Sequence, residues 1–166
     1  MRHFNNIEAM KTVYCANVRG ILEYASAVWS PSYNCHKQSI ERVQRKFFKW
    51  VTFKLRLPLI SENYNQEQIG LKALELRRKN FDIMLIFKLI NNFTDCKYLL
   101  SRIGLNCRTV HLRSREVFHI SFTPTNNSLN SPLTRSQRLA NNCQVDIFST
   151  TIFALKRHFE SQVLNY

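Results

Sequence analysis

The chain has 166 residues, the size of one domain with a single core. Lys and Arg number 24 against 11 Asp and Glu, giving a net charge of +13 at pH 7. Only three residues are glycine, which excludes collagen-like chains, and Gly20, Gly70 and Gly104 are too far apart for a Walker or dinucleotide-binding loop. With 45% hydrophobic residues the chain can fold around a core. We predict a mainly α fold, a single open helical domain over residues 1–166 with a less regular arm containing possible short strands, and the charge indicates a polyanionic partner.

Four helices are predicted in the first part of the chain, residues 1–92, which we expect to form a helical core. Their apolar periodicity places them at residues 7–29, 36–54, 63–69 and 73–91. Gly20 makes a break possible in the first helix, and Gly70 is expected to end the third as a C-terminal glycine. The fourth helix is apolar on nearly all sides between residues 81 and 90, which favours a buried, central position.

A less regular arm is predicted over residues 93–130, followed by C-terminal helices within residues 131–166. Residues 109–113 and 117–122 alternate between apolar and polar side chains, which is typical of short strands or extended arms. Residues 123–128 are rich in Thr, Asn, Ser and Pro, and we expect a loop there.

Two helices are predicted to complete the chain, at residues 132–142 and 150–160. Ser131 and Ser149 stand at the expected N-cap positions, where a hydroxyl can accept a backbone N–H. Pro132 suits the first helical position, because its fixed φ is helical and no donor is needed there.

We expect an intracellular protein, in the cytoplasm or the nucleus. The N-terminal residues lack the apolar core of a secretory signal. The most apolar stretch, residues 81–90, contains Asp82 and Lys88, so no membrane span is predicted. The five cysteines include no Cys-x-x-Cys pair, which favours reduced thiols over a disulfide framework or a zinc ribbon.

No catalytic, metal or cofactor site is predicted, and we expect neither enzymatic activity nor a small-molecule ligand. Two-metal polymerase chemistry needs clustered carboxylates, whereas Asp82, Asp95 and Asp146 are isolated in the sequence. Cys35 and His36 are neighbours, but adjacent side chains on a helix do not face one another as a nucleophile and its base must.

The basic face of the second predicted helix is the candidate binding site. Its cations form a row with a short extension after the helix: Arg42, Arg45, Lys46, Lys49, Lys54 and Arg56. Glu41 is the only acidic residue that offsets them locally. Such a row can contact phosphates without reading sequence, and a solvated helix face is the alternative interpretation. Secondary basic patches are residues 77–79 and a group made of Arg108, Arg113 and Arg115.

Apolar residues of the same helix are predicted to face the core on the opposite side: Ile40, Val43, Phe47, Trp50 and Val51. Tyr24, Trp29 and Tyr33, near the end of the first predicted helix, could stack on nucleic-acid bases. Their helical spacing favours positions in the core instead. We expect Tyr24, Val28 and Trp29 to pack against the apolar side of the second helix, leaving its basic face outward.

Four short motifs follow one another along the chain, at residues 22–31 (LEYASAVWSP), 40–47 (IERVQRKF), 71–78 (LKALELRR) and 81–92 (FDIMLIFKLINN), with a looser match over residues 113–159. Together they resemble the C-terminal, post-palm region of non-LTR retrotransposon reverse transcriptases, especially those of the jockey-like elements of insects. The positions that carry the match, to which the resemblance gives structural roles, are Leu22, Glu23, Tyr24, Trp29, Pro31, Glu41, Gln44, Glu75, Arg77 and Arg78.

The resemblance implies a C-terminal fragment of an element-encoded RNA-directed DNA polymerase that lacks the catalytic palm. We expect the fragment to contact the backbone of RNA or of a primer–template duplex through the basic row. The missing polymerase body is a further candidate partner. A structural or protein-interaction module, and a degenerate element fragment without independent function, stay open as alternatives.

Overall fold

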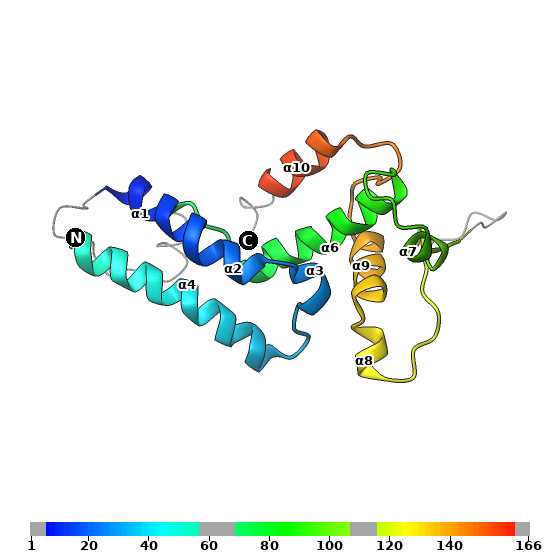
Figure 1. Ribbon diagram of the computed structural model, residues 1–166, viewed down its shortest axis with the longest axis horizontal. Helices are drawn as coiled ribbons and strands as arrows, with labels where there is room; N and C mark the ends of the chain where they lie inside the picture. Colours follow the sequence, from blue (N-terminus) through cyan, green and yellow to red (C-terminus); the bar gives the residue numbers. More distant parts are fainter. Residues whose placement is uncertain (1–5, 57–68, 107–115, 162–166) are drawn as a thin grey trace. The chain divides into compact units, whose positions relative to one another are not determined.

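The computed structural model describes residues 6–56, 69–106 and 116–161 (Figure 1). These residues are mainly helical, with one two-stranded sheet, which confirms the predicted mainly α class. They fall into two compact units. The first unit contains Met1–Ser26 and Pro31–Arg78, and the second contains Ala27–Ser30 and Lys79–Tyr166. Compact units of this kind can belong to one domain, so the single domain stays a prediction.

Helices make up the described part of the first unit, and two of them continue into residues of the second. They are α1 (Ile7–Tyr14), the π-helical turn η1 (Cys15–Arg19), α2 (Gly20–Glu23), α3 (Ser26–Trp29), α4 (Asn34–Leu55) and α6 (Leu74–Ile90). The predicted bounds of the second and fourth helices lie within two residues of α4 and α6.

The first predicted helix breaks at a different residue from the one expected. Gly20 keeps a helical φ of −55°, whereas Ala25 has a φ of +49° and separates α2 from α3. A glycine weakens a helix by about 1 kcal/mol, which packing can outweigh. In this segment the packing comes from Met10 and Tyr14, both nearly fully buried.

The core of the first unit lies between α1 and α4, which run side by side (Figure 1). Its buried apolar members are Met10, Tyr14, Phe48, Val51, Ile69 and Leu71. The Tyr14 ring stacks on Phe47 with 4.2 Å between ring centroids. The Tyr14 hydroxyl donates a hydrogen bond to Gln44 Oε1 at 3.2 Å, so a polar contact fixes the register of the two helices.

Gly70 has a φ of +67°, as the expected C-terminal glycine requires. A side chain at this position would be strained, and its Cβ would lie 3.2 Å from Lys11 Nζ. The short helix predicted at residues 63–69 lies outside the described residues, apart from Ile69.

The second unit combines the C-terminal part of α6 with short elements and two longer helices. These are α7 (Lys97–Ser101), β1 (Gly104–Leu105), β2 (Phe118–His119), α8 (Asn126–Leu129), α9 (Pro132–Asn141) and α10 (Ile152–Ser161). Its core contains Ile83, Ile86, Phe87, Phe118, Ala140, Ile147, Leu155 and Phe159. Three of these residues, Ile83, Ile86 and Phe87, come from the apolar stretch at residues 81–90, which confirms its predicted burial.

The two strands pair antiparallel, with Gly104 opposite His119. A Cβ at Gly104 would lie 3.2 Å from the Cβ of His119, so glycine allows this close approach. Strand β2 falls within the strand predicted at residues 117–122, whereas β1 was not predicted. The other predicted strand, at residues 109–113, lies outside the described residues.

A helical turn replaces part of the loop predicted at residues 123–128. The turn is α8, and the Thr125 hydroxyl oxygen caps it by accepting the Ser128 N–H at 3.2 Å. Thr and Asn typify loops, but the same side chains cap short helices, and the sequence pattern alone does not separate these uses.

Helices α9 and α10 confirm the two predicted C-terminal helices, although their caps differ. Pro132 is the first residue of α9, while the Ser131 hydroxyl donates to Thr134 Oγ1 at 2.9 Å rather than capping the backbone. At α10 the cap is Thr151, whose Oγ1 accepts the Ala154 N–H at 3.3 Å. Ser149 instead donates to an Asp146 carboxylate oxygen at 2.8 Å, and this hydrogen bond lowers the pKa of Asp146.

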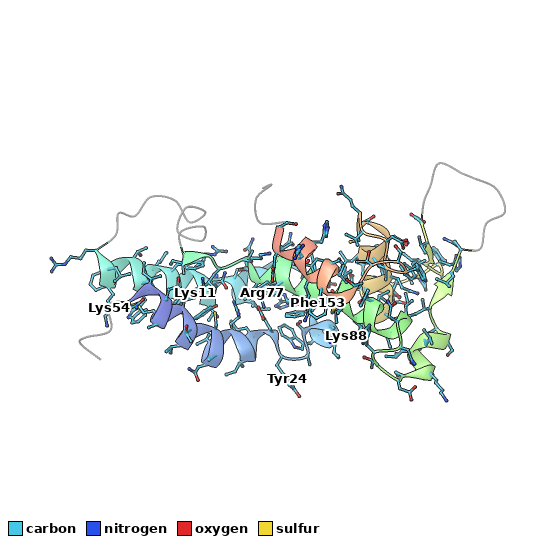
Figure 2. The ribbon with its side chains drawn as sticks, turned by 90° about the horizontal axis from the view of Figure 1, so that it is seen from above. Lys11, Tyr24, Lys54, Arg77, Lys88 and Phe153 are labelled. Carbon is cyan, nitrogen blue, oxygen red and sulfur yellow. The ribbon has the colours of Figure 1, made fainter. Side chains whose placement is uncertain are left out.

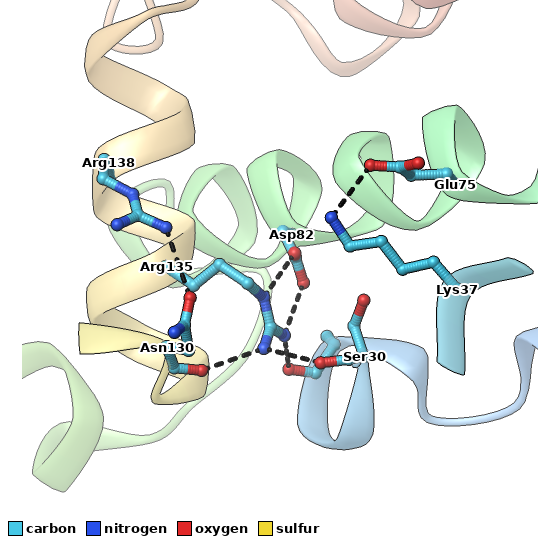
Figure 3. A network of polar contacts seen from close by, with 8 residues as sticks. Ser30, Lys37, Glu75, Asp82, Asn130, Arg135 and Arg138 are labelled. Atoms are coloured by element: carbon cyan, nitrogen blue, oxygen red, sulfur yellow. Dashed lines mark hydrogen bonds and ion pairs between the residues drawn. The ribbon is translucent and has the colours of Figure 1, made fainter. Parts of the chain in front are cut away.

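A buried ion pair organises the second unit (Figure 3). Arg135 donates from Nε and Nη2 to the two carboxylate oxygens of Asp82, at 2.8 and 3.1 Å. The same guanidinium also donates to the backbone carbonyls of Ala27, Ser30 and Asn130. Ala27 belongs to the one-turn helix α3, and Ser30 and Asn130 directly follow α3 and α8, so one side chain satisfies acceptors that these short helices leave unpaired.

Replacing Tyr14 with phenylalanine should change how stability depends on pH. Burial is the main cause that raises the pKa of the Tyr14 phenol, to about 12 from 10.0. Below pH 10 both the folded and the unfolded chain keep this proton; between about pH 10 and 12 only the unfolded chain releases it, so the wild type loses stability as pH rises. Tyr14→Phe should cost about 1–3 kcal/mol at neutral pH, because it leaves the buried Gln44 Oε1 without its hydrogen-bond donor, and this deficit should shrink above pH 10.

Urea unfolding at a series of pH values measures this effect. Tyr33→Phe, which removes an exposed phenol of the same unit, is the matched control and should follow the wild type. If the wild-type and Tyr14→Phe curves stay parallel from about pH 9 to 12, the buried phenol is not the source of the pH dependence.

Candidate nucleic-acid interface

Helix α4 divides into a buried side and an exposed side. It runs for 22 residues without glycine or proline and ends at Arg56, which adopts a left-handed φ of +51°. The buried residues are Gln44, Phe48, Val51 and Thr52. The Thr52 hydroxyl donates back to the carbonyl of Phe48 at 3.0 Å, so this polar residue can lie in the core.

The buried line differs from the predicted apolar stripe. Val51 is buried, but Val43 and Trp50 are 37% and 47% exposed, so their predicted burial is wrong. Gln44 occupies the core instead, because both ends of its amide are paired. Its Oε1 accepts the Tyr14 hydroxyl, and its Nε2 donates to the Lys72 carbonyl at 3.0 Å.

Three of the predicted cations form one line on the exposed side of α4. Arg42, Lys46 and Lys49 are all exposed. Their spacing of four and then three residues puts them on one face of the helix, here called the outer stripe. Side chains on such a stripe can reach successive phosphates of one strand.

The other three predicted cations flank the outer stripe or follow it. Arg45 and Lys54 are half-buried, and Arg56 is exposed just after the helix. Lys54 Nζ lies 5.4 Å from the centroid of the Trp50 ring, a cation–π contact. Arg56 closes the helix, and its N–H hydrogen-bonds to the carbonyl of Phe53.

Glu41 does not neutralise the outer stripe, because its carboxylate is used elsewhere. Glu41 Oε1 accepts the backbone N–H of Glu75 at 2.6 Å and lies 4.0 Å from Nη2 of the buried Arg78. Lys37, one turn before Glu41, pairs with the Glu75 carboxylate at 3.1 Å (Figure 3). Since Glu41 is the only acid within residues 34–56, α4 contributes no negative side chain to its outer stripe.

Several motif positions of the resemblance meet in the first unit as polar partners. Arg77 forms a two-point ion pair with Glu23, with 2.8 Å between Nη2 and Oε2. The hydrogen bond to Glu23 raises the pKa of Arg77. Together with Glu41, Gln44 and the residues they bind, this pair ties α2, α4 and the start of α6 to one another. The motif spacing marked these residues, but no signal in the sequence showed which ones pair.

The aromatic residues near α3 were predicted to lie in the core, and this prediction is wrong. Tyr24 and Tyr33 are 80% and 63% exposed, and Val28 and Trp29 are also exposed. Figure 2 shows Tyr24 directed away from the ribbon. In the first unit the buried aromatic residue of this part of the chain is Tyr14, not Tyr24 or Tyr33.

The remaining predicted positions carry less of the site. Leu22 and Pro31 are half-buried. In the patch at residues 77–79, both arginines lie beside carboxylates of the first unit, so they do not form an outward basic patch. Arg108, Arg113 and Arg115 lie outside the described residues.

Within residues 6–56, 69–106 and 116–161, no three His, Cys, Asp or Glu side chains gather where a metal ion could be held. No helix among the same residues is long and apolar enough to cross a membrane.

Comparisons with protein-family models, with curated proteins and with solved structures find no match to this chain.

Removing the Glu41 carboxylate should destabilise the first unit. We expect Glu41→Ala to lower the free energy of unfolding by about 1.5–3 kcal/mol, because hydrogen bonds to a charged group contribute that much. Gln38→Ala, at an exposed position of the same helix, is the matched control and should change it by less than about 0.5 kcal/mol. Chemical denaturation of both variants measures the difference, and equal effects would show that the Glu41 contacts contribute nothing.

Proposed function

We propose that this chain is a non-catalytic part of a non-LTR retrotransposon reverse transcriptase that binds RNA or DNA through the outer stripe of α4. The observation that carries the proposal is the direction of the charges on α4. Arg42, Lys46 and Lys49 face solvent in one line, while Glu41 turns away into the first unit. A helix face arranged in this way has a net positive field, and α4 itself supplies no acidic side chain to offset it.

Phosphate contacts explain how such a face would work. Each cation that neutralises a phosphate releases a bound counter-ion, so affinity falls steeply as salt rises and depends little on base sequence. The net charge of +13 adds a long-range attraction that speeds encounter with a polyanion.

The motif residues are the basis for proposing the polymerase family. Glu23, Glu41 and Arg77 make the polar contacts that join α2 and α4 to α6, and Gln44 joins α4 to Tyr14 of α1 and to the Lys72 carbonyl just before α6. This use supports the structural role that the resemblance gives them, since a binding surface needs a fixed scaffold behind it. The proposed protein would act in the cytoplasm or the nucleus, beside a polymerase body that supplies the chemistry.

A salt series on the whole chain tests the proposal. We expect fluorescence anisotropy with a labelled RNA to give a dissociation constant on the order of micromolar at low salt. The logarithm of the association constant should fall linearly with the logarithm of the salt concentration. Reversing the charge of Arg42, Lys46 and Lys49 to Glu should lower the slope of that line by about two to three, because about one ion is released for each phosphate contact.

A second triple charge reversal serves as the control. Lys88, Lys97 and Lys156 are exposed and lie outside α4, and their reversal to Glu changes the net charge by the same amount. The control should lose less affinity and keep most of the slope. If both triple variants lose the same affinity, the outer stripe is not the site, and if the wild type binds no nucleic acid at low salt, the function is wrong.

Exposed apolar side chains favour a protein-interaction module as the second candidate. Val13, Ile21 and Tyr24, on or just after α1 and α2, are 51%, 76% and 80% exposed. An apolar surface of this kind commonly marks a protein contact. The module predicts self-association of the isolated chain, visible as a concentration-dependent mass in light scattering after size exclusion. A monodisperse monomer at all concentrations would contradict it.

A further inference from the structure

The outer stripe of α4 continues into an aromatic side chain. Phe53 follows Lys49 by four residues, so Arg42, Lys46, Lys49 and Phe53 share one helix face. Phe53 is 86% exposed, whereas Phe48, five residues earlier on the same helix, is 3% exposed. The helix thus buries one phenylalanine in the core and presents another to solvent among its cations.

Phe53 differs from an isolated exposed apolar residue because of what surrounds it. Trp50, three residues earlier, is 47% exposed and lies beside it on the helix. Lys54 covers the Trp50 ring, and Phe47 packs near it at 6.2 Å between ring centroids. Trp50 is therefore held in place by its neighbours, while the ring of Phe53 is open to a ligand.

A line of cations that ends in an open aromatic ring fits single-stranded nucleic acid better than a duplex. The cations match the phosphates of either form. Only a single strand offers an unpaired base face for the ring, because a duplex keeps its bases stacked on one another. From Arg42 to Phe53 the stripe is about 16 Å long, at a rise of 1.5 Å per residue. This length corresponds to roughly five nucleotides of a stacked strand.

We infer that Phe53 is a stacking platform for a base of single-stranded RNA or DNA whose phosphates lie along Arg42, Lys46 and Lys49. The inference rests on the proposed function, because it assigns a ligand form to the same face. Base stacking on an aromatic side chain tolerates any base, so the site selects single strands without reading their sequence.

Anisotropy with three labelled probes of about ten nucleotides tests the inference: a single-stranded RNA, the same sequence as single-stranded DNA, and a DNA duplex. We expect Phe53→Ala to weaken binding of both single strands by roughly five-fold to a hundred-fold and to leave duplex binding within two-fold. Phe53→Trp should retain single-strand affinity, because it keeps an aromatic face. The salt slope should not change in either variant, because no phosphate contact is removed.

Phe122→Ala is the matched control. Phe122 is 92% exposed, and its sequence neighbours Ser121 and Thr123 carry no charge. Its loss should not affect binding of any probe. Phe53 and Phe122 are both exposed and belong to neither core, so neither substitution removes a core side chain.

The outcomes separate this inference from the proposed function. If the wild type binds all probes with a steep salt dependence and Phe53→Ala binds the single strands equally well, the stacking platform is wrong while the basic interface stands. Equal losses on single strands and duplex would also overturn the platform. If the wild type binds no probe at low salt, both proposals fail together.

Discussion

The hydrogen bond between the Glu41 carboxylate and the backbone N–H of Glu75 determines the charge of the exposed face of α4. At 2.6 Å it satisfies one of the donors that the N-terminus of α6 leaves unpaired, and the positive end of that helix favours a carboxylate there. Because Glu41 is the only acid in α4, the direction of its side chain decides whether the outer stripe carries a negative charge. With Glu41 turned inward, α4 has no acidic side chain to offset the cations of the outer stripe.

Polar contacts, as much as apolar packing, hold the first unit in register. Gln44 is 1% exposed and bonded at both ends, and the Glu23–Arg77 pair joins positions 54 residues apart in the chain. A buried polar group is satisfied in few geometries, so such contacts select one arrangement of helices where apolar surfaces would allow several. In the second unit the pair between Asp82 and Arg135 works in the same way, and Arg135 also donates to carbonyls of Ala27 in α3 and of Asn130 after α8.

Periodicity was a good guide to where helices form and a poor one to which side they bury. The predicted helices at residues 36–54 and 73–91 lie close to α4 and α6, because long amphipathic or apolar patterns without proline leave few alternatives. The predicted apolar side of α4 failed at Val43 and Trp50. Periodicity counts Gln44 as an outward residue, and its partners Tyr14 and Lys72 become neighbours only in the fold.

The sequence by itself determined the mainly α class, the positive charge and a row of cations along the second predicted helix, because helix geometry converts their spacing directly into a shared face. The tertiary structure confirmed that this face points outward, and it alone decided that Arg45 is half-buried, that Glu41 points away from the cations and that Phe53 is exposed beside them. These features depend on which distant residues approach α4. Local spacing does not encode that approach, since it is set by packing and hydrogen bonding among segments far apart in the chain.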